Sequence, residues 1–204
     1  MSKNEIVKLG PAPALSHKLG DAILNIVLNV PTSRETRSDA SQARAQALAR
    51  SAAKQAALMS GSLALPPGFL GWLTLVPELV GVWKVQAQMV SDIAAVYGKS
   101  AYLGREQMVY CLFKHVSAQL FRDVVVRVGE RMVMRGASQG LLQTIARTLG
   151  VKVTQKVMGK GLTRFVPLIG AVGVGAYAYF DTLQVAKTAT ELFSSEITLE
   201  AGEF

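Results

Sequence analysis

The most regular alternation of apolar and polar residues lies between residues 77 and 97. At about 100° per residue, its apolar positions share one face of a helix and its polar positions the other. The apolar face consists of Leu79, Val82, Trp83, Met89, Val90, Ile93, Ala94 and Tyr97. Pro77 suits the first turn of this helix, and Gly98 suits its end. Gln86 falls inside the apolar face, either as a core glutamine bonded to a loop backbone or as a ligand contact.

Two further helices are predicted before it. Residues 22–30 form an amphipathic pattern that ends before Pro31, and residues 38–59 are rich in alanine, which favours a helix. Between them, Thr32-Ser-Arg-Glu35 has the spacing of a capping box. In that motif a hydroxyl and a carboxylate satisfy the free amides at a helix start.

The second half of the chain also contains helical patterns. A helix is predicted from about residue 106, with apolar positions at Val109, Phe113, Val116 and Leu120. Residues 124–128 are a β-branched run that fits a short strand, but alanine, leucine and methionine around them favour a helix. Another helix is predicted over residues 140–149, and we expect Gly150 to break it.

Two stretches contain no charged residue, at 55–77 and at 165–180. The first is long enough for a bilayer crossing, which needs about 20 apolar residues, but Pro66-Pro67-Gly68 argues against a straight helix. A helical hairpin, buried in the core or dipping into a membrane, fits better. The second stretch is short for a crossing. Its many glycines and alanines permit close contacts between helices, in a tight core or in a membrane.

These patterns predict an all-α fold, a compact multi-helix bundle with two hydrophobic helical hairpins, near residues 57–83 and 162–185. Residues 1–40 are expected to form an N-terminal arm and the amphipathic helix. Residues 41–195 would form the main helical domain, and residues 196–204 an acidic tail.

Composition narrows the class of protein. Half of the 204 residues are apolar and 18% are charged, which excludes an intrinsically disordered chain. The single cysteine excludes a disulfide framework. The net charge of +8 equals that of residues 105–164 alone, whereas residues 165–204 carry −4. A basic segment of this kind indicates an anionic partner, or else a solvated helical face.

Few residues are suited to catalysis or to binding a metal. Cys111 and His115 stand four apart, but a thiolate–imidazole pair needs a third, orienting group, and a metal site needs more ligands. We interpret Cys111 as a small packing residue. The sequence lacks a phosphate-binding loop followed by lysine, and few aromatic residues lie among the basic ones. We therefore predict no enzyme, no cofactor, no metal and no nucleic-acid partner.

Two segments resemble the EcsC-like proteins of bacteria. The first runs from Leu65-Pro-Pro-Gly-Phe-Leu-Gly-Trp to Ile93-Ala-Ala-Val-Tyr-Gly98, and the second from Phe165-Val-Pro-Leu-Ile-Gly-Ala-Val-Gly173 to Ala186. The resemblance covers about residues 45–190 and rests mostly on apolar positions. It implies a helical protein at the cytoplasmic face of a bacterial membrane, and it supplies no catalytic residues.

The function predicted from these features is that of a non-enzymatic, membrane-associated accessory protein. Apolar hairpins and a basic face would dock on anionic lipid at the inner membrane, peripherally or partly embedded. The residues expected to contact lipid are Phe69, Leu70, Trp72, Leu73, Arg127, Arg131, Arg135, Lys152, Lys156, Lys160, Phe165 and Ile169. The alternative is a soluble helical module that binds a lipid or a partner protein in a hydrophobic cavity.

Overall fold

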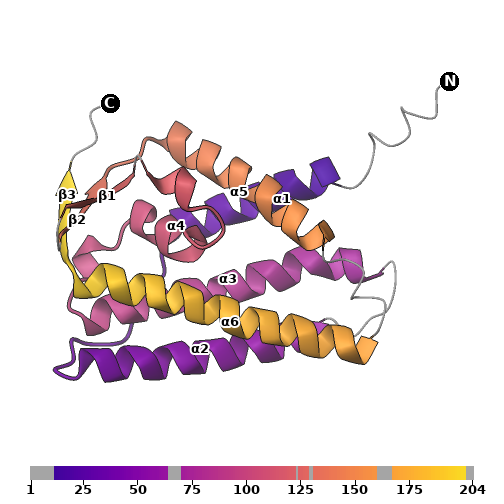
Figure 1. Cartoon of the computed structure of the whole chain (residues 1–204), viewed down its shortest axis with the longest axis horizontal. Helices are drawn as coiled ribbons and strands as arrows, with labels where there is room; N and C mark the ends of the chain where they lie inside the picture. Colours follow the sequence, from indigo (N-terminus) through magenta and orange to yellow (C-terminus); the bar gives the residue numbers. More distant parts are fainter. Residues whose placement is uncertain (1–11, 64–69, 123, 129–130, 160–166, 201–204) are drawn as a thin grey trace.

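The computed structural model of the chain describes residues 12–63, 70–122, 124–128, 131–159 and 167–200 (Figure 1). The all-α prediction is confirmed, with a small sheet added to the helical bundle. The helices are α1 (Ala12–Leu28), α2 (Ser41–Leu63), α3 (Leu70–Val96), α4 (Arg105–Phe113), α5 (Gln139–Gly159) and α6 (Pro167–Ser194). The strands are β1 (Val125–Val128), β2 (Arg131–Arg135) and β3 (Glu196–Glu200). Within these residues, no helix has the length and apolar character that a membrane crossing requires.

The three longest helices, α2, α3 and α6, run side by side (Figure 1). Small residues let them approach closely: Ala56, Val82 and Ala178 form a buried cluster where the three helices meet. The glycine- and alanine-rich stretch of α6 is thus divided. Its Ala178 is packed in the core, whereas Gly173 lies exposed. From Pro167 onward this stretch is one continuous helix, so the hairpin expected near residues 162–185 has no turn after residue 167.

The helix predicted over residues 77–97 is present, but it begins earlier than expected. α3 starts at Leu70, and Pro77 lies inside it. A proline within a helix removes one backbone hydrogen bond. The helix continues because Val76 and Leu79, on either side of this proline, both pack against the core. The predicted end is confirmed: Gly98 has a positive φ of 68°, which glycine adopts without strain.

α1 crosses α5 through two glycines. A Cβ atom on Gly150 would lie 2.8 Å from the Gly20 nitrogen and 3.1 Å from its Cα, so the two backbones touch there. The expectation that Gly150 breaks the helix is wrong, because α5 runs through it without interruption. This glycine serves the helix crossing instead. Leu19 and Ile23 of α1 are fully buried, so the N-terminal helix belongs to the main core.

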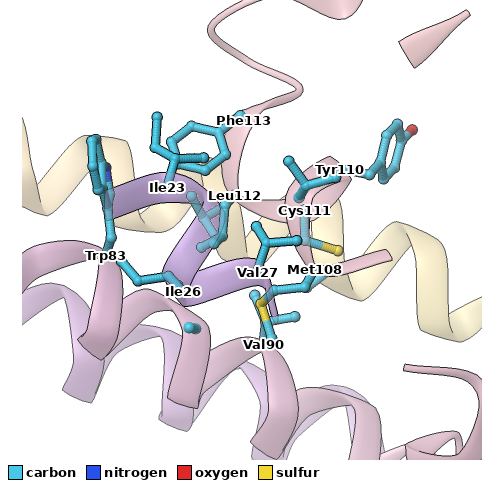
Figure 2. Close-up of a cluster of buried hydrophobic side chains, with 14 of the residues drawn as sticks. Ile23, Ile26, Val27, Trp83, Val90, Met108, Tyr110, Cys111, Leu112 and Phe113 are labelled. Atoms are coloured by element: carbon cyan, nitrogen blue, oxygen red, sulfur yellow. The ribbon is translucent and has the colours of Figure 1, made fainter. Parts of the chain in front are cut away.

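α4 lies at the centre of the core (Figure 2). Every side chain of residues 107–113 is buried, and the ring of Phe113 meets that of Trp83 edge to face, with centroids 5.3 Å apart. Cys111 lies in the same cluster, near Val27 of α1 in this view, as a packing residue. The helix ends at Phe113 rather than continuing through residue 120. Val116 and Leu120 still pack against the same core, but from the turns that follow the helix.

The preference for a helix over residues 124–128 is wrong. Val125–Val128 form β1, which pairs antiparallel with β2, as β-branched residues favour. β2 then pairs in parallel with β3, so the start of the acidic tail is a strand of the same sheet. In this register Arg131 stands beside Glu196, and Arg135 stands beside Glu200. Acidic and basic segments that are far apart in the sequence therefore meet in adjacent strands.

The capping-box spacing at residues 32–35 does not mark a helix start, and the alanine-rich helix α2 begins at Ser41. The hydroxyl of Ser33 accepts a hydrogen bond from the Glu35 amide and donates one of 2.6 Å to Asp92 of α3. The Glu35 carboxylate accepts hydrogen bonds from two guanidinium nitrogens of Arg44 in α2, Nε and Nη2. The motif therefore ties the connection between α1 and α2 to the bundle instead of capping a helix.

Candidate functional site

The last turns of α2 and α5 and the first turns of α3 and α6 lie together at one end of the long axis (Figure 1). We call this region, together with the rest of the first half of α6, the bundle end and define it as residues 54–63, 70–77, 152–159 and 167–180. Both uncharged stretches of the sequence lead into it. It carries lysines from α2 and α5 and no acidic residue.

The structure places the expected lipid-contact residues in two separate regions. Helices α3, α5 and α6 bring Leu70, Trp72, Leu73, Lys152, Lys156 and Ile169 to the bundle end. The side chains of Leu70, Trp72, Leu73 and Ile169 lie outside the described residues, as do Phe69, Lys160 and Phe165 altogether. Arg127, Arg131 and Arg135 are in the sheet, away from the bundle end (Figure 1). The expected basic face is therefore divided.

The two lysines of α5 differ in their surroundings. Lys152 is half-buried, whereas Lys156 is exposed and its Nζ lies 5.3 Å from the ring centroid of Tyr177 in α6. A lysine ammonium over an aromatic face is attracted by the ring, with an energy of about 0.5–1 kcal/mol at exposed positions. This contact links the surface of α5 to α6 at the bundle end.

Beneath this contact lies a buried polar network centred on Asp181. Its Oδ1 is 2.9 Å from His115 Nε2, just after α4, and its Oδ2 accepts a hydrogen bond of 2.9 Å from Gln86 Nε2 of α3. Gln86 also donates to the hydroxyl of Thr182, at 3.1 Å. Gln86 is thus a core glutamine, but its partners are side chains of α6 rather than the expected loop backbone. The network connects three elements across the core.

The electrostatics of the network favour a charged carboxylate. Burial alone would raise the pKa of Asp181, but hydrogen bonds from His115 and Gln86 and the charge of Lys156 outweigh it, and the pKa is lowered. The pKa of the Tyr177 phenol is raised by burial, by the charge of Asp181 and by a hydrogen bond to it. Tyr177 thus stays neutral and connects the surface lysine to the buried carboxylate.

The imidazole of His115 is the second side chain of the Asp181 network with an unusual environment. Its Nδ1 is buried and, within the described part of the chain, has no hydrogen-bond partner. The neighbouring thiol does not supply a nucleophile, since burial raises the pKa of Cys111 and keeps it protonated. Among the described residues, no group of three histidine, cysteine or acidic side chains is arranged to hold a metal ion.

The apolar surface near the bundle end contains two strongly exposed side chains. Leu58 of α2 is 76% exposed and Phe180 of α6 is 65% exposed, the highest values among the large apolar residues described. Tyr177, one turn before Phe180, is 41% exposed. Exposed apolar side chains of this size are typical of contact surfaces when they gather in one region.

A second surface feature is a groove between α2 and α3. It has a volume of about 320 Å³ and is open to solvent. Lys84, Gln88 and Asp92 form its polar side, and Leu48 and Met89 contribute apolar side chains. Because Asp92 already accepts hydrogen bonds from Ser33 and Gln88, part of the polar lining is engaged within the protein.

Sequence reasoning missed the residues that form the centre of this site. Asp181 and Thr182 were not singled out, and neither were Leu58 and Phe180. One signal was available: Asp181 is the first charged residue after an uncharged stretch, one helical turn beyond Tyr177. Its partners could not be read from the sequence, since they lie 66 and 95 residues away.

No known protein family, curated protein or solved structure matches this chain.

Proposed function

We propose that this chain is a non-enzymatic accessory protein that docks on anionic membrane lipid through the bundle end. The observation that carries the proposal is the composition of that region. Exposed Leu58 and Phe180 lie on helices whose uncharged stretches lead into this region, and the ammonium of Lys156 lies over the Tyr177 ring of α6. Lys152 precedes Lys156 by one turn on α5. Membership of the EcsC-like family and a position at the bacterial inner membrane belong to the same proposal.

The energetics of docking follow from two contributions. Burying a large apolar side chain releases about 1.5–3 kcal/mol, so partial insertion of Leu58 and Phe180 would hold the bundle end in the interface. Each lysine close to an anionic surface adds about 1 kcal/mol. The arginines of the sheet contribute less in this arrangement, because they lie elsewhere and two of them stand beside acidic positions of β3.

Vesicle flotation tests the proposal with matched variants. We expect the full chain to float with vesicles containing phosphatidylglycerol and to bind pure phosphatidylcholine more weakly. Leu58→Ser with Phe180→Ser should lower the affinity at least about tenfold, from the apolar area removed. Lys152→Gln with Lys156→Gln should lower it by about tenfold or more, from two lost headgroup contacts.

The controls use exposed residues away from the bundle end. Leu141→Ser in the first turn of α5 and Lys187→Gln in the second half of α6 should leave binding unchanged, although their side chains are 39% and 73% exposed. Equal losses in the control and test variants, or no flotation with anionic vesicles, would contradict docking through this region.

The groove between α2 and α3 favours a second candidate, a soluble module that binds a lipid or a partner protein. Its 320 Å³ volume is in the range of small ligand sites, which start near 300 Å³. Native mass spectrometry of protein purified without detergent tests this candidate. A co-purified lipid that is lost in a Ser51→Trp variant, which would fill the groove from its exposed side, would favour it over docking.

A further inference from the structure

A chain of side-chain contacts leads from the surface of the bundle end into the core. The ammonium of Lys156 lies over the Tyr177 ring, 5.3 Å from its centroid. Tyr177 precedes Asp181 by four residues on α6, so the two side chains share one face one turn apart. Asp181 in turn contacts His115 at 2.9 Å and Gln86 at 2.9 Å. A change at the surface lysine therefore acts on a largely buried carboxylate–imidazole pair.

The described residues around this pair come from several elements. From α6, Asp181 contacts His115 and Tyr177 bonds to Asp181; the charge of Lys156 acts on Asp181 from α5, and α3 contributes the neutral Gln86. On its own segment, Lys114 is directed toward Glu191, 3.4 Å away, and toward the ring of Tyr110. The buried Cys111 thiol is neutral, and Glu78 is a further buried acid on α3. Of the two lysines, Lys156 is the more exposed, and Lys114 is paired with Glu191.

We propose that binding of an anionic lipid phosphate by Lys156 is coupled to proton uptake at His115 through Tyr177 and Asp181. This inference rests on the proposed docking of the bundle end. A phosphate at Lys156 draws the ammonium away from Tyr177 and brings a negative charge to the same place. Both changes make the surroundings of Asp181 and His115 more negative, which favours the protonated imidazole.

Thermodynamic linkage between phosphate binding and protonation then determines whether acid strengthens or weakens membrane binding. If the phosphate favours protonation of His115, protonation favours the phosphate by the same factor. Membrane binding should therefore be stronger at about pH 5.5 than at about pH 8. Coupling between sites in proteins is commonly 5-fold or more, and we expect about a 5-fold change in affinity here.

The experiment uses the full chain and vesicles of phosphatidylcholine with about 30 mol% phosphatidylglycerol, at about pH 8 and pH 5.5. The phosphodiester of this lipid does not titrate in that range. The wild type and His17→Gln, a control in the only other histidine, should both bind about 5-fold more tightly at the lower pH. His115→Gln should bind with the same affinity at both.

A second variant separates coupling from loss of folding. Tyr177→Phe keeps an aromatic ring under Lys156 but removes the hydroxyl that bonds to Asp181. Its affinity for anionic vesicles should be the same at pH 8 and at pH 5.5, because the link to Asp181 is lost. Circular dichroism confirms that each variant is folded.

The outcomes distinguish the two proposals. Tighter binding at low pH in His115→Gln and Tyr177→Phe, equal to that of the wild type, would overturn the coupling and leave docking intact. No binding to anionic vesicles at either pH would overturn both. Soluble glycerophosphoglycerol tests the source of the phosphate: the same pH-linked affinity for it, without a membrane, would overturn the assignment to lipid.

Discussion

At the scale of single residues, Asp181 determines how the polar core is built. It lies near the middle of the longest helix and receives hydrogen bonds from two other elements. A buried carboxylate without such partners would shift toward its neutral form. Here the partners hold the charge, and the lowered pKa records the balance between their attraction and burial.

Replacing this carboxylate should change how stability depends on acid. Because the folded-state pKa of Asp181 lies below its ordinary value of 3.8, its contribution is present above about pH 4 and is lost as the pH falls through the lowered value. Asp181→Asn should lower the free energy of unfolding at pH 7 by about 2 kcal/mol and make the acid limb shallower. Urea unfolding between pH 7 and pH 2 measures both.

The exposed carboxylate of Asp21 on α1 provides the control for that measurement. Asp21→Asn should leave both the stability and its dependence on pH close to those of the wild type. A variant at Asp181 that loses stability equally at every pH would contradict the role of the charge, and would indicate lost packing instead.

At the scale of elements, the glycines of α5 show that the same residue type has different roles. Gly150 lies in contact with the backbone of Gly20 in α1, whereas a Cβ on Gly140 would meet its nearest atom, Ser138 Oγ, at 3.9 Å. The first glycine is required by the crossing of two helices. The second is only a poor helix former at an open position.

The two glycines should respond oppositely to alanine. Gly150→Ala should lower the free energy of unfolding by about 1–3 kcal/mol, since the added methyl pushes α1 and α5 apart, despite better helix propensity. Gly140→Ala should be neutral or raise it by up to about 1 kcal/mol. Thermal or urea unfolding gives both values, and a stabilised Gly150→Ala variant would contradict the close crossing.

Elements also show where local patterns are ambiguous. The β-branched residues 125–128 are compatible with helix or strand, and the hairpin partner β2 decides for the strand. Pro77 is compatible with the start or the interior of a helix, and contacts of its neighbours with the core decide for the interior. Whether such a segment becomes a strand or a helix interior depends on which neighbouring elements it packs against.

At the scale of the whole molecule, the shortest α-helix is the most completely buried one. α4 has nine residues, too few for stability as an isolated helix, yet its side chains from residue 107 onward are buried by α1, α3 and α6. The ends of longer helices form the exposed bundle end. The fold thus combines an enclosed centre with an apolar, basic bundle end.

Hydrogen exchange should reflect this distribution. The amides of residues 109–113 should be among the slowest to exchange, with the protection of global unfolding, because opening α4 requires the surrounding helices to separate. Amides on the exposed side of α2 should exchange through smaller openings. Mass spectrometry of peptides measures the difference, and faster exchange in α4 than in α2 would contradict an enclosed centre.

The sequence by itself determined the all-α class, the buried face of residues 79–94 and the end of that helix at Gly98. Helical periodicity and the positive φ of glycine are properties of neighbouring residues, so they can be recognised without the fold. The tertiary structure alone decided that Asp181 meets His115 and Gln86, that Gly150 joins two helices, and that β3 lies beside β2. Each of these depends on contact between segments distant in the chain, which composition and spacing do not encode locally.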